Sequence, residues 1–370
     1  MKTLLNCIMV ILCILFAGHS MAGLLPGEGI ARDPVTGNYT ATFFVEGEDG
    51  KDWLETGDFE TATKIDPTVR STFKHAEGWS IRYAYTIKNG SAAKQAINHF
   101  DLYGLPIYMV LLNSTPLTGS GNVVLMELLD SSLLVPNSKW SGSGGRDGQA
   151  LNIGWLCKGW DPATKSHNTA VGIQPGETAS GFGYASPDLP GVFMAQLLGN
   201  TSYHQFDFSG SGPSYEKSDI ARQMDEVVGK DFIPRNVAAP LIIVPSQFDA
   251  AIVLDRIRTH VATWPAKQLV DSVFASQLDR YLGAAAESFR LNQPKAGRQH
   301  IESLRKLLDH EHKYLDHDDE DNDDTPEHKA ATRLTIDRLA ARVLDFDLRY
   351  VLKRMEKEHE HDHDDGDHRK

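Results

Sequence analysis

Two segments near the C-terminus concentrate the side chains that could bind metal ions. Residues 309–327 read DHEHKYLDHDDEDNDDTPE, in which ten of nineteen residues are acidic and one is basic. Carboxylate oxygens are the ligands that Ca²⁺ prefers, and imidazoles suit Zn²⁺, Cu²⁺ and Ni²⁺. The final segment after residue 356 adds further imidazoles, at His359, His361, His363 and His368.

The acidic stretch partly fits a calcium-binding loop between two helices. Numbered from Asp316, it has oxygen donors at loop positions 1, 3, 5, 9 and 12. Position 6 is Asp321 where the sharp turn needs glycine, and Pro326 lies where the exiting helix should already hold the last ligand. Three readings stay open: a defined loop site, loose cation binding and a solvated loop. The candidate ligands are Asp316, Asp318, Glu320, Asp324 and Glu327.

The histidine-rich tail has a His-X-His-X-His pattern. Alternate residues of an extended chain face one way, and His359 and His363 would share a face of a helix. Such tails either capture transition metals loosely or merely solubilise the chain. A continuous helix from Pro326 to about Met355 would separate the tail from the acidic stretch by roughly 45 Å. We therefore treat the two segments as separate features.

A second kind of chemistry is suggested by His99 and Asp101, which lie two residues apart in an apolar run and would share a strand face. His204 and Asp207 form a similar pair, which also flanks a phenylalanine, Phe206. These residues could form one hydrolytic or metal site, or they could be surface pairs flanking a buried phenylalanine.

Several familiar catalytic motifs are missing from the sequence. It contains no Gly-x-Ser-x-Gly elbow to complete a triad with Asp161 and His167, no phosphate-binding loop and no paired cysteines. Cys157 lies in an apolar context, which is typical of an inert buried thiol.

The N-terminus predicts an exported protein. Lys2 precedes an apolar run over residues 4–16, and small residues at Ser20 and Ala22 suit a signal peptide cleaved after residue 22. The alternative, an uncleaved anchor, needs a longer apolar run. No later segment is apolar enough to cross a bilayer, so we expect a periplasmic, cell-surface or secreted protein.

The charge balance excludes one class of partner. The formal net charge is −13, and no basic patch is present to bind nucleic acid. We instead expect an extracytoplasmic ligand or protein as partner.

The elements that carry these residues change character along the chain. Alternating apolar residues over 79–88 predict a strand, followed by an Asn89-Gly90 turn with positive φ. Residues 141–148 predict a flexible loop, and 215–228 an amphipathic helix. After residue 245 the apolar spacing is helical, including a helix with Pro265 in its first turn.

The predicted fold class is a multi-domain β + α protein, an antiparallel β-sandwich followed by a three- to four-helix bundle. Its predicted parts are a signal peptide (1–22), the sandwich with loop and helical insertions (23–245), the bundle (246–356) and a disordered tail (357–370).

Two resemblances follow from particular residues. One apolar and alanine-rich pattern in the later helical segment consists of Leu278, Leu282, Ala285, Ala286, Pro294, Lys295, Ala296, Gly297, His300, Leu304, Ala330, Leu334, Leu339 and Ala340. With this pattern, the segment resembles small helical modules at the C-termini of exported bacterial proteins. The β part is similar to secreted bacterial domains of uncharacterised role. It is carried by Trp79, Arg82, Tyr83, Tyr85, Asn89, Gly90, Gly154, Trp155, Ile173, Gln174, Pro175, Gly176, Gly181, Phe182, Gly183, Pro190 and Gly191. Both imply an exported protein and neither implies a catalytic residue.

The sequence therefore predicts an exported, non-enzymatic binding or surface-associated module. Divalent cations (Zn, Ni, Cu or Ca) would bind loosely to the acidic stretch and the histidine tail. The alternative is a secreted hydrolase that uses Asp and His residues on sandwich loops.

Overall fold

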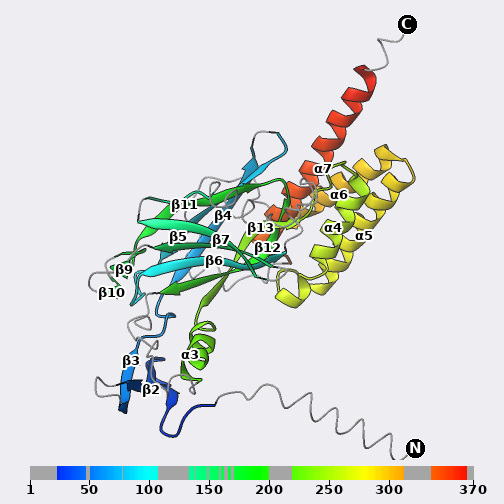
Figure 1. The fold of residues 1–370 in the computed structure, drawn as a ribbon. Helices are drawn as coiled ribbons and strands as arrows, with labels where there is room; N and C mark the ends of the chain where they lie inside the picture. The colour runs from blue at the N-terminus through cyan, green and yellow to red at the C-terminus, as the bar shows by residue number, and fades with distance from the viewer. Residues whose placement is uncertain are drawn as a thin grey trace, which may run out of the picture.

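The computed structural model shows a β + α protein, with antiparallel sheets in the first two thirds of the chain and helices in the last third (Figure 1). The structure describes residues 23–46, 51–76, 78–106, 133–137, 139–147, 150–157, 160–161, 166–167, 171–199, 219–311 and 335–364.

Among the described residues the strands form four sheets, and every pairing between them is antiparallel. Their orders are β1-β2-β3, β10-β9, β11-β5-β4 and β13-β12-β6-β8-β7. The strands are β1 (Gly29–Arg32), β2 (Tyr39–Glu46), β3 (Asp52–Phe59), β4 (Pro67–His75), β5 (Ile81–Asn89), β6 (Ile97–Pro106), β7 (Trp140–Asp147), β8 (Ala150–Cys157), β9 (Trp160–Asp161), β10 (Ser166–His167), β11 (Thr178–Ser186), β12 (Leu189–Gly199) and β13 (Ile233–Ile242).

Aromatic side chains join the β11-β5-β4 sheet to the five-stranded sheet. The ring of Tyr85 on β5 lies 5.1 Å from that of Phe100 on β6, and its hydroxyl donates to the backbone oxygen of Ala238 on β13 at 2.8 Å. Phe182 on β11 meets Trp140 on β7 edge-on at 4.9 Å. The inner faces of the two sheets therefore share one apolar core.

Strand β5 confirms the alternation read from the sequence. Ile81, Tyr83, Tyr85 and Ile87 are buried, while Arg82 between them is exposed. The strand lies in the middle of its sheet, so one face forms the core and the other faces outward.

The expected turn at Asn89-Gly90 is wrong, because neither residue has a positive φ. The chain passes here from β5 to β6 in the other sheet, so no tight hairpin is needed. The buried Asn89 amide instead holds three segments together. It donates to the backbone oxygens of Gln95 and Ile173 and accepts from the N–H of Asp66.

The expected loop at 141–148 is also wrong, because residues up to 147 belong to β7, the edge strand paired with β8. Its glycines weaken the local preference for a strand, but they also let the chain approach its neighbours. A Cβ added at Gly142 would lie only 3.0 Å from the side chain of Leu133. Tertiary pairing therefore overrides the flexible composition.

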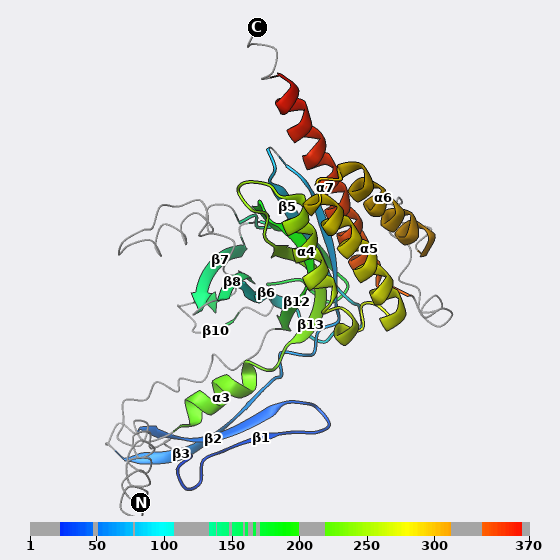
Figure 2. The ribbon, with the colours of Figure 1, turned by 90° about the vertical axis from the view of Figure 1, so that its right-hand side faces the viewer.

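The small sheet β1-β2-β3 forms a separate unit with helix α3 (Ile220–Val228), which the sequence did not separate from the other strands (Figure 2). Tyr39 and Phe43 on β2 pack with Ile220 and Met224 of the helix in a core of their own. The predicted amphipathic helix is confirmed over its second half. We call β1–β3 and α3 the N-terminal unit.

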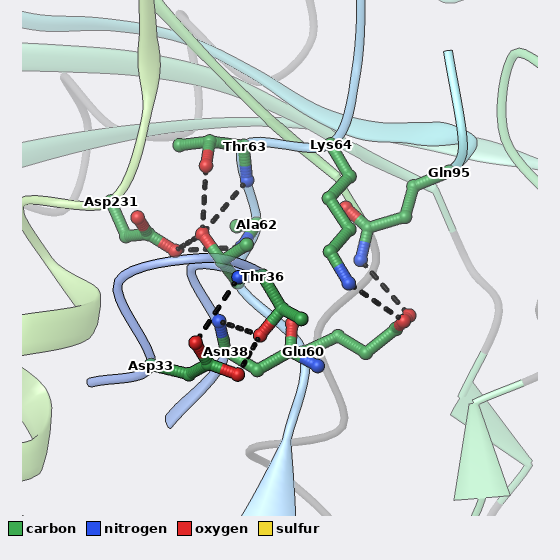
Figure 3. Close-up of polar contacts among 10 residues, drawn as sticks. Asp33, Thr36, Asn38, Glu60, Ala62, Thr63, Lys64, Gln95 and Asp231 are labelled. Atoms are coloured by element: carbon green, nitrogen blue, oxygen red, sulfur yellow. Dashed lines mark hydrogen bonds and ion pairs between the residues drawn. The ribbon is translucent and has the colours of Figure 1, made fainter. Parts of the chain in front are cut away.

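Three chain segments meet where the N-terminal unit joins the larger sheets, around Ala62, Gly199 and Asp231, and we call this place the neck. Figure 3 shows the contacts of Asp231 with the segment that contains Ala62. Asp231, just before β13, accepts hydrogen bonds from the backbone N–H of Ala62 at 2.7 Å and from the Thr61 hydroxyl. Gly199, which ends β12, donates its N–H to the backbone oxygen of Ala62 at 2.7 Å. One buried carboxylate thus links the chain leaving β3 to the chain entering β13.

The C-terminal third contains four α-helices among the residues that the structure describes. Asp249 caps α4, Asp271 caps α5 and Asp337 binds the first N–H groups of α7. The elements are α4 (Ala250–Val261), the 3₁₀ helix η4 (Pro265–Lys267), α5 (Ser272–Arg290), α6 (Pro294–Glu311) and α7 (Arg338–Asp364).

Two helix starts differ from the sequence expectation. Pro265 belongs to η4, and Gln268 with φ 58° ends that turn before α5 begins. Residues 335–337 are not helical, because Ile336 bridges to Val270, so no helix continues unbroken from Pro326. Helix α7 also continues to Asp364, through the first half of the segment expected to be disordered.

Helix α7 lies against the end of the β4–β5 hairpin. The Phe346 ring meets Phe73 of β4 edge-on at 5.1 Å, and the Arg354 guanidinium lies 4.3 Å from the centre of the Trp79 ring. These contacts add cation–π attraction to apolar burial and fix the helix on the sheet edge.

Candidate functional site

The residue pair that the sequence singled out on a strand lies on the five-stranded sheet. His99 and Asp101 flank the buried Phe100 on β6, so both project from the sheet face opposite the core. Their predicted common face is confirmed. They sit on a strand and not on a loop, and β6 is the central strand of its sheet.

Neighbouring strands place polar and apolar groups beside this pair. Asp101 pairs with Gln196 of β12 and with Gly154 of β8, while His99 pairs with Leu156 of β8. We call this surface the outer sheet face, and we define it by His99, Asp101, Tyr103, Leu156, Met194 and Gln196.

Three larger side chains on the outer sheet face are open to solvent. Tyr103 is 53% exposed, Met194 50% and Leu156 40%. They come from three adjacent strands, β6, β12 and β8. One aromatic ring and two apolar side chains thus surround the hydrogen-bonding groups of Asp101 and Gln196, which is a composition typical of binding surfaces.

The Asp101 carboxyl lies directly on the backbone of the next strand. A Cβ added at Gly154 would come within 2.4 Å of Asp101 Oδ1, so the absence of a side chain at Gly154 makes room for the carboxyl. Burial raises the pKa of Asp101 to about 7. Near neutral pH the group is therefore shared between its acid form, which donates a hydrogen bond, and its carboxylate form, which accepts one.

The His99 ring belongs to the same surface but has its own partner. Its Nδ1 lies 3.2 Å from the side-chain oxygen of Asn98. Residues two apart on a strand are separated by roughly 7 Å, so one bound polar group could contact both His99 and Asp101. Chemically, the pair can donate, accept or move a proton at a ligand placed between them.

A second group of acidic residues, which the sequence analysis missed, is buried between the sheets and the helices. Asp188 lies at the turn from β11 to β12, and burial raises its pKa to about 6. Asp347 on α7 is also buried, and desolvation raises its pKa well above the usual range. Each has one oxygen without a hydrogen-bond partner among the described residues, Asp188 Oδ2 and Asp347 Oδ1.

Neighbouring groups tie Asp188 into the core. Its backbone oxygen accepts from the Tyr83 hydroxyl at 2.7 Å, and its Oδ1 accepts from the N–H of Val244 at 3.1 Å. The charge of Arg256 lowers the Asp188 pKa but does not offset burial. The local sequence does not reveal that these acids are buried, because Asp188 lies in the turn-like segment Ser-Pro-Asp-Leu-Pro and Asp347 lies between Asp345 and Arg349.

The predicted metal ligands of the acidic stretch, residues 316–327, lie outside the described residues. His359, His361 and His363 fall within the last turns of α7, and His368 lies beyond the described chain. Within the described ranges, no three His, Cys, Asp or Glu side chains come together in a way that could hold a metal ion.

The other catalytic candidates are separated or lie elsewhere. Strand pairing sets Asp161 opposite Ser166 and His167 opposite Trp160, so Asp161 and His167 are not paired. His204 and Asp207 lie outside the described residues. Cys157 is buried and burial raises the pKa of its thiol, as expected for an inert cysteine.

Comparisons give no further guide to this surface. In the part of the chain that the structure describes, no helix combines the length and apolar character needed to cross a bilayer. No family model, no curated protein and no solved structure matches the chain.

Proposed function

We propose that this chain is an exported, non-enzymatic binding module whose ligand lies on the outer sheet face. The export proposal rests on the apolar run and small residues before Gly23. The ligand is hydroxyl-rich and polar, such as an oligosaccharide, because the surface offers a carboxyl, an amide and an exposed phenol ring. Looser divalent-cation binding by the acidic stretch and the histidine tail is a separate part of the proposal.

In finer terms, we propose a β-sandwich followed by a helical bundle. The ring contacts from Tyr85 to Phe100 and from Phe182 to Trp140 support a sandwich, since they connect the inner faces of two antiparallel sheets. The ion pair from Arg305 of α6 to Asp345 of α7, at 2.8 Å, supports a bundle. The outer sheet face is then the solvent side of one sandwich sheet.

One observation carries the binding proposal: Tyr103, Leu156 and Met194 are 40–53% exposed around Asp101. Apolar side chains scattered singly on a surface need no explanation, but these three come from adjacent strands and enclose a carboxyl whose pKa burial has raised. A ligand that covers them gains apolar burial from the ring and hydrogen bonds from Asp101 and Gln196.

Titration calorimetry with a panel of neutral, acidic and basic soluble oligosaccharides tests the proposal. At least one member should bind the whole chain, and Tyr103→Ala should weaken that binding at least tenfold. Val273→Ala is the matched control, because Val273 is an exposed apolar residue on α5. Binding that Tyr103→Ala leaves unchanged, or a panel with no binder, would overturn the proposal.

A hydrolase is the second candidate, and the Asp101 pKa of about 7 favours it. A carboxyl with that pKa serves as a general acid or base near neutral pH, and His99 lies on the same strand face. Chromogenic esters and glycosides provide the test. Turnover that falls at least a hundredfold in Asp101→Asn would establish the hydrolase, whereas equal rates in both proteins would exclude Asp101 as its acid or base.

A further inference from the structure

We propose that the outer edge of β3 binds an extended, basic peptide segment of another protein, which adds as a fourth strand to the small sheet. This surface belongs to the N-terminal unit and is distinct from the outer sheet face. The inference therefore does not depend on the proposed ligand of Asp101.

Strand β3 is the last strand of the order β1-β2-β3. Its inner edge pairs with β2 from Tyr39↔Phe59 to Glu46↔Asp52, and no other described strand pairs with its outer edge. In both views the sheet stands apart from the larger sheets (Figures 1 and 2). An edge of this kind offers a row of backbone N–H and C=O groups to an incoming strand.

The exposed end of β3 carries apolar side chains that helix α3 does not cover. Phe59, at the neck end, is buried with Ile220 and Met224 of α3. At the opposite end of the strand, roughly 20 Å away, Trp53 is 50% exposed and Leu54 is 45% exposed. These neighbours project to opposite faces of the sheet, so a strand added here would have an apolar contact on each face.

Charge selects the incoming strand. Strand β3 contains Asp52, Glu55 and Asp58 and no basic residue. Residues 46–60 contain seven acidic residues and one lysine. A lysine-rich or arginine-rich strand would place positive charge beside Glu55 on one face or beside Asp58 on the other, and opposite charges on adjacent strands attract.

The same charges disfavour a second copy of this chain as the occupant. Two β3 strands paired edge to edge would bring acidic residues of both copies together, and like charges across a strand pair repel. Acidic residues on an edge strand also prevent self-association of exposed edges. The edge of β3 therefore repels the β3 edge of a second copy and attracts a basic peptide. Main-chain hydrogen bonds would provide affinity, and charge would provide selectivity.

Fluorescence anisotropy with the full chain and labelled synthetic octapeptides tests this proposal. The probes alternate lysine with valine or glutamate with valine, and a third lysine peptide is N-methylated at two successive central residues so that both of its edges are blocked. We expect the lysine peptide to bind, with at least tenfold weaker binding of the glutamate peptide and of the methylated peptide.

Variants of the chain locate the binding site. Glu55→Lys and Trp53→Ala should each weaken binding of the lysine peptide at least fivefold. The matched control is Glu226→Lys, which makes the same charge change at an exposed position on α3 of the same unit and should leave binding within twofold. Circular dichroism checks that each variant keeps its secondary structure.

Several outcomes would overturn the proposal. Equal binding of the methylated peptide would mean that charge alone attracts it, without strand addition. Equal effects of Glu55→Lys and Glu226→Lys would place the peptide elsewhere. Concentration-dependent dimerisation of the wild type in sedimentation velocity, lost in Trp53→Ala, would show that a second copy occupies the edge.

Discussion

The carboxylate of Asp231 accepts a 2.7 Å hydrogen bond from the backbone N–H of Ala62, 169 residues away in the chain. It also accepts from the Thr61 hydroxyl and lies 3.5 Å from the Arg32 guanidinium. Because Asp231 is buried at the neck, its loss would leave the Ala62 N–H without this acceptor (Figure 3). The relationship explains how the N-terminal unit is attached to the larger sheets.

Asp231→Ala should lower the free energy of unfolding by about 1–3 kcal/mol, the usual cost of leaving buried hydrogen-bond groups unpaired. Urea unfolding measures the loss, and hydrogen exchange at Ala62 should accelerate. Glu226→Ala, an exposed acid on α3, is the control and should change stability by less than about 0.5 kcal/mol. Equal stability of both variants would show that the neck does not depend on Asp231.

Asp188→Asn should change how stability depends on pH. The folded-state pKa of Asp188 is about 6, above its ordinary value, so the folded protein binds more protons than the unfolded chain between about pH 4 and 6. This group therefore favours folding in acid, and its contribution is lost as pH rises through 6. A neutral asparagine removes the titration.

Urea unfolding from pH 4 to 8 checks this prediction. Relative to wild type, Asp188→Asn should gain stability on going from pH 4 to pH 8, by up to roughly 3 kcal/mol for a pKa shift of about two units. The parallel substitution Asp347→Asn should act in the same direction, because its pKa is also raised. A difference between variant and wild type that stays constant with pH would contradict the burial argument.

His260 should change the pH dependence of folding stability in the direction opposite to Asp188 and Asp347. Its ring nitrogen Nε2 accepts a 3.1 Å hydrogen bond from the N–H of Val192, and burial lowers its pKa to about 4. The folded state thus requires the neutral His260 ring. Its contribution to the free energy of unfolding is lost as pH falls from about 6.5 through 4.

His260→Gln provides an acceptor without a titrating ring. We expect the variant to lose less stability than wild type between pH 7 and pH 4, whatever its stability at pH 7. The control is His300→Gln on α6. An acid-side slope that is the same in wild type and in His260→Gln would show that His260 is not the group responsible.

Replacing the four tail histidines, His359, His361, His363 and His368, with glutamine tests the proposed cation binding. Titration calorimetry with zinc, copper and nickel should show weak binding to wild type that is lost in the variant, because neutral imidazoles are the ligands for these ions. Calcium should still bind to the acidic stretch. If all four ions leave wild type and variant unchanged, the cation proposal is wrong.

The elements that could be predicted from sequence are those in which one residue pattern decides the outcome. The alternation around Tyr83 and Tyr85 identifies β5, and the apolar spacing of Ile220 and Met224 identifies α3. Asn89 and Gly90 mislead because a crossing between sheets, not a hairpin, follows them. Local composition carries no information about which strand comes next in space.

In the candidate site too, the features set by local pattern could be predicted and those set by tertiary structure could not. His99 and Asp101 could be placed on one face from their spacing, because alternation along a strand is a local property. Gln196 and Gly154 could not, since their positions beside Asp101 depend on strand order and register. The raised pKa of Asp101 follows from burial by those neighbours, so it also required the tertiary structure.

NMR shift mapping tests directly whether the outer sheet face binds the ligand. Isotope-labelled full chain would be titrated with the oligosaccharide that binds tightest in calorimetry. We expect the largest amide shifts at Asp101, Tyr103 and Gln196, with little change at Trp53 on β3. Largest shifts on the helices or on the N-terminal unit, with Asp101 and Tyr103 unchanged, would contradict it.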